Sequence, residues 1–188
     1  MSEADLEFEP VFEFVVYDAY TDRALKGYKG ETLPSLGITY RYRCPLHDRI
    51  EYLTMLDIDK TEKDENDILT LTSSLPDVPA IIGETLNGYH VILVTHTTYK
   101  TLAVLRAVIL AVKLRRKGLP VDPYHIKIGL RNDAIILRTY GKYSERPTVT
   151  LTYVNVPDDV VVTELVRLYT IGERIWYTYK YRRRPSGG

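Results

Sequence analysis

The sequence predicts an α+β fold, with a mostly antiparallel sheet packed on helices. Several short segments alternate apolar and polar residues as strands do, Asn87-Gly88 is a strong signal for a tight hairpin, and few segments have a helical period. A chain of 188 residues that is 45% hydrophobic suits a single domain. We expect that domain over 1–181, followed by a disordered basic tail over 182–188.

The first part of the chain is predicted to form strands joined by turns. Phe12–Tyr17 alternates as a strand does, whereas Thr21–Leu36 contains two glycines and a proline and is typical of a loop. Strands are then predicted over Ile38–Arg43 and Ile50–Asp59, with a turn at Cys44–Asp48 between them.

A short helix and a hairpin are predicted next. Thr61–Asp64 has the spacing of a capping box, which predicts a helix that begins there and ends before Pro76. Strands over Ala80–Glu84 and Tyr89–Thr95 then flank Asn87-Gly88, whose residues tolerate the positive φ angles of a tight turn.

The clearest helix begins after Thr97 or Thr98, either of which is a suitable N-cap, and ends before Gly118 and Pro120. Basic residues in its last turn suit the helix dipole. One stripe of apolar side chains predicts the face that packs on the core. That stripe consists of Leu102, Leu105, Val108, Ile109 and Val112.

The last third of the chain is predicted to return to strands. Ile126–Leu130, Ala134–Tyr140 and Thr148–Val154 have strand-like composition. A helix is predicted over Asp158–Ile171, and an alternating strand over Arg174–Tyr181.

Composition excludes several classes of protein. The 25 Lys and Arg residues balance 25 Asp and Glu residues, which excludes a uniformly basic, histone-like binder. The single cysteine, Cys44, excludes an intramolecular disulfide and a multi-cysteine zinc site. We expect an intracellular protein, because no signal peptide or membrane-spanning segment is recognisable. The absence of glutamine, together with one cysteine, motivates the hypothesis of a thermophilic source.

The first candidate site is the pair Asp57 and Asp59, in the segment Met55–Lys60. Side chains alternate along a strand, so both carboxylates point to one face while Leu56 and Ile58 enter the core on the other. Carboxylate oxygens suit Mg²⁺ or Mn²⁺, which also bind nucleotide phosphates. The alternative is a solvated strand end that leads into a turn.

The second candidate is His90, which follows the Asn87-Gly88 turn. At the start of a strand its imidazole could donate a hydrogen bond to a phosphate. The alternative is a partly buried hairpin histidine with a structural hydrogen bond.

Taken together, the two segments resemble the catalytic core of the archaeo-eukaryotic primase superfamily. The shared order is a strand with Asp57-Ile58-Asp59, a short helix, a strand, a turn with Gly88-Tyr89-His90 before an apolar strand, and then a long helix. The resemblance covers Met55 to about Leu93 and extends towards Lys142. It implies an RRM-like primase–polymerase core.

The third motif of that family combines an acid with a basic strand, and here Arg138-Thr139-Tyr140-Gly141-Lys142 is similar to its second half. Asp122 is the favoured third acid and Asp133 is the alternative. By resemblance, Asp57, Asp59 and Asp122 would hold two Mg²⁺ or Mn²⁺ ions, while His90, Arg138 and Lys142 would bind the nucleotide.

The resemblance implies a metal-dependent nucleotidyltransferase that adds an NTP or dNTP to a nucleic-acid primer or template in replication or repair. A helicase or an accessory replication subunit is an expected partner, and a membrane is not. Two alternatives stay open: a catalytically inactive nucleotide- or nucleic-acid-binding subunit, and an accessory protein whose acidic pair only caps a loop.

Basic residues supply candidate contacts to nucleic acid, namely Arg115 and Lys117 at the end of the long helix and Arg182 and Arg183 in the tail. Cys44 and His47 have the spacing of half a zinc knuckle. No second Cys/His pair follows them, so we expect a simple turn there.

Overall fold

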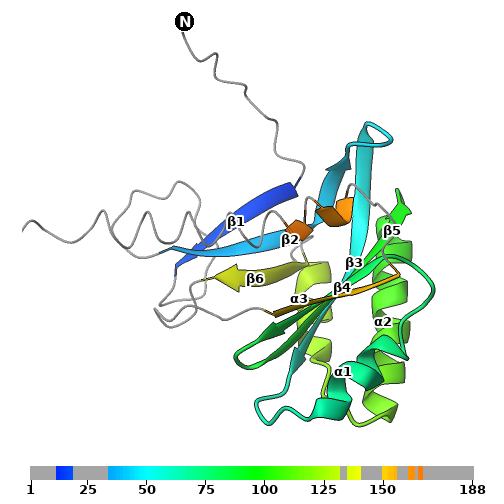
Figure 1. Ribbon diagram of the computed structural model, residues 1–188. Coiled ribbons are helices and arrows are strands. Elements are labelled where there is room, and N and C mark those ends of the chain that lie inside the picture. Colours follow the sequence, from blue (N-terminus) through cyan, green and yellow to red (C-terminus); the bar gives the residue numbers. More distant parts are fainter. Residues whose placement is uncertain are drawn as a thin grey trace, which may run out of the picture.

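The computed structural model describes residues 12–18, 34–131, 135–140, 150–155, 161–163 and 165–166, and it has an α+β fold with an antiparallel sheet (Figure 1). The elements follow one another as β1 (Phe12–Asp18), β2 (Pro34–Cys44), β3 (Arg49–Asp59), α1 (Glu65–Thr72), β4 (Ala80–Thr85), β5 (Gly88–Thr97), α2 (Lys100–Arg116), α3 (Pro123–Arg131), β6 (Ile136–Tyr140) and β7 (Thr150–Val154). Within the described residues, no helix is both long enough and apolar enough to cross a membrane.

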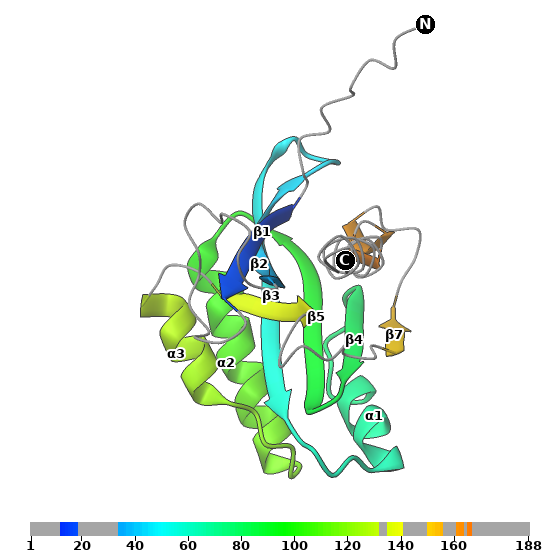
Figure 2. The same ribbon diagram turned by 90° about the vertical axis from the view of Figure 1, so that its left-hand side faces the viewer.

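The sheet has seven strands in the order β1-β2-β3-β5-β4-β7, and β6 pairs with β2 outside that path. Every pairing is antiparallel. The second half of β2 pairs with β3 and forms a hairpin that ends in the turn at 45–48, whereas its first half pairs with β1 and β6. In both views this hairpin turn and α1 lie at opposite ends of the molecule, and β3 runs between them (Figures 1 and 2).

β3 and β5 form the centre of the core. Leu53, Met55, Leu56 and Ile58 are all fully buried, so both faces of β3 are covered over most of its length. α2 packs on the face that carries Leu56 and Ile58, where the Thr54 hydroxyl donates a 3.1 Å hydrogen bond to the carbonyl oxygen of Ala103. The opposite face of β3 carries Glu51 at the hairpin end and Asp57 and Asp59 at the α1 end.

The apolar stripe predicted to be the core face of α2 lies largely on its exposed side, so that prediction is wrong. Leu105 and Ile109 are 54% and 60% exposed, and Val108 and Val112 are exposed as well. Half of the residues that are buried instead are alanines, and their small side chains let the helix backbone approach β3 closely enough for the hydrogen bond from Thr54. The buried face consists of Ala103, Val104, Ala107, Leu110, Ala111 and Leu114.

Both helix starts differ from the predictions. α1 has its capping box at Asp64 and Asp67, three residues after Thr61: the Asp64 carboxylate accepts from the Asn66 amide and the Asp67 carboxylate from the Asp64 amide. The N-cap of α2 is Tyr99, without a side-chain cap, while the hydroxyl oxygen of Thr97 accepts from the Tyr99 amide.

The strand predicted over Ile126–Leu130 is wrong, because these residues belong to helix α3 beside α2 (Figure 2). A short apolar run fits a strand and a buried helix equally well, and Pro123 at the first helical position favours the helix. The other strands up to Val154 are confirmed to within four residues at their ends, and the largest difference is at β2, which begins at Pro34 inside the segment expected to be a loop. Helical residues occur at 161–163 and 165–166, inside the predicted Asp158–Ile171 helix, whereas Arg174–Tyr181 and the tail lie outside the described residues.

Candidate functional site

The Gly88-Tyr89-His90 segment starts β5 directly against the end of β3. The amide of Lys60 donates to the carbonyl oxygen of Asn87 at 2.8 Å, and Gly88 pairs with Asp59. A Cβ atom on Gly88 would lie 1.7 Å from the carbonyl oxygen of Ile58, which is much closer than a van der Waals contact allows. Only glycine therefore allows β5 to begin here, which is a structural reason for the glycine of the motif.

Tyr89 has a structural role on the opposite face from His90. Its ring is buried, and its hydroxyl donates a 3.3 Å hydrogen bond to Asp67 of α1. Burial and the nearby Asp67 carboxylate raise the pKa of Tyr89 to about 12, so its hydroxyl stays protonated. The ammonium of Lys63 lies 5.7 Å from the centre of the same ring. Tyr89 thus fastens α1 to the strand that carries His90.

Asp57 and His90 are direct partners in the antiparallel pairing of β3 with β5, so their side chains share one face of the sheet. The His90 Nε2 atom lies 3.8 Å from the Asp57 Oδ1 atom. His90 is buried, with 6% of its surface exposed, while Asp57 is half-buried. The structure therefore brings together the first acid and the histidine that the sequence singled out.

Asp122 lies beside Asp57, although 65 positions separate them in the chain. Val121 forms an antiparallel bridge with Ile58, and the Asp122 amide donates to the carbonyl oxygen of Asp57 at 3.3 Å. The Asp122 Oδ1 atom also accepts a 2.8 Å hydrogen bond from the Tyr124 amide in the first turn of α3. One carboxylate oxygen of Asp122 thus helps to begin a helix.

Asp59 follows Asp57 by one strand repeat and is exposed. Asp57, Asp59 and Asp122 border the same end of β3, and their oxygen atoms are the kind of ligand that Mg²⁺ and Mn²⁺ prefer. These three aspartates do not form a compact ligand group. Among the described residues, a different set of side chains has its ligand atoms all within 4.8 Å of one another. The donors fit the ions in kind, and the site is open.

The predicted basic residues are only partly placed. Arg138 lies in β6 and pairs with Gly37 of β2, so in the order of pairing β2 and β3 separate its strand from β5, which carries His90. Arg115 and Lys117 are exposed at the end of α2, shortly before Asp122 in the chain. Lys142, Arg182, Arg183 and the alternative acid Asp133 lie outside the described residues.

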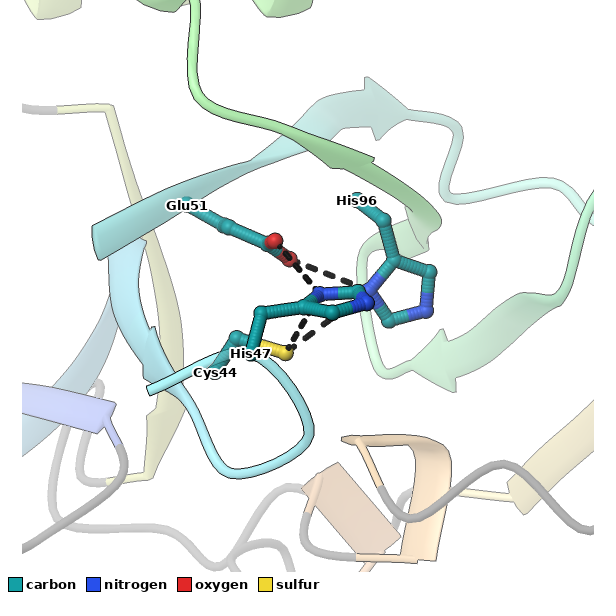
Figure 3. Close-up of side chains that lie close together, drawn as sticks. All are labelled: Cys44, His47, Glu51 and His96. Atoms are coloured by element: carbon teal, nitrogen blue, oxygen red, sulfur yellow. Dashed lines mark hydrogen bonds and ion pairs between the residues drawn. The ribbon is translucent and has the colours of Figure 1, made fainter. Parts of the chain in front are cut away.

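The compact ligand group is Cys44, His47, Glu51 and His96, at the hairpin end of β3 (Figure 3). The His47 Nδ1 atom lies 2.8 Å from Glu51 Oε1, and the His96 Nδ1 atom lies 3.0 Å from Glu51 Oε2. The Cys44 sulfur lies 3.4 Å from His47 Nδ1 and 3.8 Å from His96 Nδ1. Two imidazoles, a thiol and a carboxylate therefore surround one point.

Glu51 is a fully buried carboxylate at the centre of this group. Burial alone would raise its pKa, but hydrogen bonds from Tyr42, His96, Arg49 and His47 outweigh that effect and lower the pKa to about 2. The Tyr42 hydroxyl donates at 2.9 Å and the Arg49 Nε atom at 3.0 Å. Burial also raises the pKa of the Cys44 thiol. Glu51 is therefore ionised at neutral pH in a site that favours a neutral thiol.

His96 enters the group through an irregularity in β5. Tyr52 pairs with Thr97 and Thr54 with Leu93, so residues 94–96 of β5 lie opposite the single residue Leu53 of β3. His96 has a φ angle of 46°, a region that costs a non-glycine residue about 1–3 kcal/mol. The bulge interrupts the alternation and turns the imidazole towards Cys44 and Glu51 (Figure 3).

Sequence reasoning missed this group, since the expectation of a simple turn at Cys44–His47 rested on the lack of a second Cys/His pair. The turn is present, but its missing partners are Glu51 and a single histidine 52 positions after Cys44. Glu51 shares its face of β3 with the buried Leu53 and Met55, and a carboxylate in that row is the signal that could have been followed.

The chain was compared with family models, curated proteins and solved structures. No family model, curated protein or solved structure matches the chain.

Proposed function

We propose that this protein is a metal-dependent nucleotidyltransferase of the primase–polymerase type, which adds nucleotides to a nucleic-acid strand. The observation that carries the proposal is the register of Asp57 with His90 across β3 and β5, with Asp122 alongside on the backbone of Asp57. Three polar positions expected to act together from their order in the sequence thus lie at one end of one sheet. An RRM-like primase–polymerase core is the finer fold assignment that belongs to this proposal.

The acids have the role of holding divalent ions. Asp57, Asp59 and Asp122 would bind Mg²⁺ or Mn²⁺, which when bound activates a 3′-hydroxyl and stabilises the leaving pyrophosphate. The open arrangement suits this role, because Mg²⁺ is commonly bound by one or two carboxylates together with substrate phosphates.

His90 and the basic residues have the role of binding phosphates. The imidazole of His90 shares a face with Asp57 and lies close to it, so a nucleotide whose metal is held by Asp57 brings its phosphates within reach of the ring. Arg115 and Lys117 end α2 just before Asp122 and would contact the phosphates of the nucleic acid. Arg138 and Lys142 have their nucleotide-binding role by resemblance alone, and a helicase or accessory subunit stays an expected partner on the same ground.

A second candidate is a nucleotide- or nucleic-acid-binding subunit of the same fold that does not catalyse. The observation in its favour is the hydrogen bond from the Tyr124 amide to Asp122, which gives the third acid a structural use. Metal-dependent nucleotide binding without strand extension would identify this second function.

Primer extension with the full chain tests the proposal. Wild type should extend a labelled primer on a template with Mg²⁺ or Mn²⁺ and either NTPs or dNTPs. Asp57→Asn/Asp59→Asn should lower the rate at least about 1,000-fold, which corresponds to about 4 kcal/mol of transition-state stabilisation. Asp77→Asn is the matched control, because Asp77 is an exposed aspartate in the loop before β4, which starts opposite Leu93 and not opposite His90.

Extension that is equally fast in the double variant would refute the assignment of the polymerase site. Titration calorimetry with Mn²⁺ and a nucleoside triphosphate then separates the candidates: binding by wild type that the double variant loses, with no extension by either, supports the binding subunit.

A further inference from the structure

The four side chains of Cys44, His47, Glu51 and His96 have the donor set of a zinc site. Zn²⁺ in proteins is bound by thiolate, imidazole and carboxylate groups, and four protein ligands are typical of structural sites. A thiolate with two imidazoles disfavours Mg²⁺ and Ca²⁺, which take oxygen ligands. The chemistry at this end of β3 is therefore different from that of the aspartates at the other end.

The donor atoms all lie within 4.8 Å of one another, which is near the separations of tetrahedral coordination without matching them. An ion about 2.3 Å from sulfur and about 2.0–2.2 Å from nitrogen or oxygen would separate its ligand atoms by about 3.3–3.6 Å. The two thiol–imidazole separations are 3.4 and 3.8 Å, and the two imidazole–carboxylate separations are 2.8 and 3.0 Å. The two imidazole–carboxylate separations are hydrogen bonds to different oxygens of Glu51, so an ion would replace these hydrogen bonds and shift several of the four side chains by small amounts.

Hydrogen bonds to the buried Glu51 carboxylate hold the group together, but they leave the imidazole–sulfur contacts unexplained. Each Nδ1 atom carries at most one proton, yet His47 Nδ1 lies near both the Glu51 carboxylate and the Cys44 sulfur. His96 Nδ1 lies near the same two groups. A proton that bonds to the carboxylate cannot also bond well to the sulfur, whereas one cation in the centre would contact all four donors.

The surroundings of the group suit a buried divalent ion. Binding of the ion would release the thiol proton of Cys44, and the resulting thiolate and the Glu51 carboxylate would together balance the two positive charges of the ion, with both imidazoles neutral. The hydroxyl of Tyr42 and the guanidinium of Arg49 both donate to Glu51 and fix its orientation, as outer partners of metal ligands commonly do. Cys44 and Glu51 are fully buried, so the interior side of the site is closed to water.

We propose that Cys44, His47, Glu51 and His96 bind one Zn²⁺ ion that fastens the β2–β3 hairpin to the bulge of β5. The role is structural, because all four tetrahedral positions are filled by the protein and none is left for a substrate. The ion joins ligands that are 52 positions apart in the chain and holds His96 in its strained backbone conformation. The site lies on the same face of β3 as Asp57 but six residues away, about 20 Å along the strand.

The first test measures zinc bound by the full chain after purification and after titration of the metal-free protein with Zn²⁺. The wild type should bind one zinc ion per chain. Cys44→Ser and His96→Ala should each lower the zinc content at least tenfold under the same conditions. His125→Ala is the matched control, because it removes a histidine on α3 outside the group and should leave zinc binding unchanged.

A folded wild-type chain that binds no zinc, or variants that bind as much zinc as the wild type, would overturn the proposal. The variants could fail to fold, so a second measurement uses the wild type alone. Titration with Co²⁺ should give the intense visible bands of a tetrahedral site together with a thiolate-to-cobalt charge-transfer band. Cys44 is the single cysteine, so that band assigns it as a ligand, and its absence would contradict the site.

Discussion

The two ends of β3 carry two groups of potential metal ligands on the same face of one strand, and they are built in opposite ways. At the hairpin end, four donor atoms from β2, the turn, β3 and β5 all lie within 4.8 Å of one another. At the α1 end, Asp57 and Asp59 lie two residues apart on β3, and Asp122 lies in the segment before α3. One carboxylate oxygen of Asp122 accepts a hydrogen bond from the Tyr124 amide of α3. One group is closed and the other is open.

The difference follows from what covers each end. Glu51 is buried and receives hydrogen bonds from Tyr42 and Arg49, which hold its carboxylate among the other three ligands before any ion binds. Asp59 is exposed at the last residue of its strand. A preformed set of four ligands suits an ion that stays in place, whereas separated carboxylates suit ions that arrive with a substrate and complete their coordination with phosphates.

The largest expected effect is at the open end, where Gly88→Ala should prevent folding. The added Cβ would meet the carbonyl oxygen of Ile58 at 1.7 Å, so β5 could not begin beside β3. We expect a loss of more than about 4 kcal/mol in the free energy of unfolding. Urea denaturation checks this for any protein that remains folded.

Gly118→Ala provides the comparison for that prediction. Gly118 has a φ angle of 87°, but a Cβ atom there would meet nothing within 4 Å. Backbone strain alone should cost about 1–2 kcal/mol. Equal losses in the two variants would show that close approach to β3 is not what requires glycine at position 88.

Removal of zinc is the next largest effect, and it acts at the closed end. At a free zinc concentration about 1,000 times the Kd, binding adds about 4.1 kcal/mol to stability. For a domain of this size, 1 kcal/mol shifts the Tm by about 2–4 °C, so a chelator should lower the Tm by roughly 8–16 °C. Scanning calorimetry with and without chelator measures the shift, and His96→Ala should show almost none. A Tm that does not respond to the chelator in wild type would contradict a structural ion.

A smaller effect is expected from Asp67, which anchors α1 next to the open end. Burial opposes its ionisation, but the ammonium of Lys60, the Asp64 amide and the Tyr89 hydroxyl outweigh burial and lower the pKa of Asp67. Asp67→Asn removes the charged partner of Lys60 and should cost roughly 1.5–3 kcal/mol at neutral pH.

The same pair predicts a pH dependence. The folded pKa of Asp67 lies below its unfolded value of about 3.9, so the stabilisation is fully present above that value and is lost as the pH falls through the folded pKa. The stability difference between wild type and Asp67→Asn should thus be constant from about pH 7 to 5 and shrink below about pH 4. Urea midpoints across that range measure it, and a difference that grows on acidification would contradict the sign of the shift.

Local patterns predicted most of the fold. Alternation located β1, β2 and β3, and Asn87-Gly88 located the β4–β5 hairpin, because these signals depend on neighbouring residues. The buried face of α2 could not be predicted from its large apolar residues, since the sheet accepts the small alanines that allow closer packing. Ile126–Leu130 was assigned to a strand because five apolar-rich residues do not distinguish a strand from a helix.

The candidate sites were less predictable than the fold. Asp57 and His90 were expected to act together only through the resemblance to the primase superfamily, and their register across β3 and β5, which are not consecutive in the chain, could not be predicted from the sequence. The group around Cys44 could not be predicted, since it requires a bulge in β5 that turns His96 out of the alternating pattern. Long-range register and an irregular φ angle are not encoded in any short motif.

The most direct test of the account is a metal analysis of three proteins: wild type, Cys44→Ser/His96→Ala and Asp57→Asn/Asp59→Asn. Zinc content is measured by mass spectrometry, and binding of Mn²⁺ with a nucleoside triphosphate is measured by electron paramagnetic resonance. The account predicts that the first variant loses zinc and that the second keeps zinc but loses Mn²⁺–nucleotide binding. Zinc loss in the aspartate variant, or undiminished Mn²⁺–nucleotide binding in it, would contradict the separate roles of the two ends of β3.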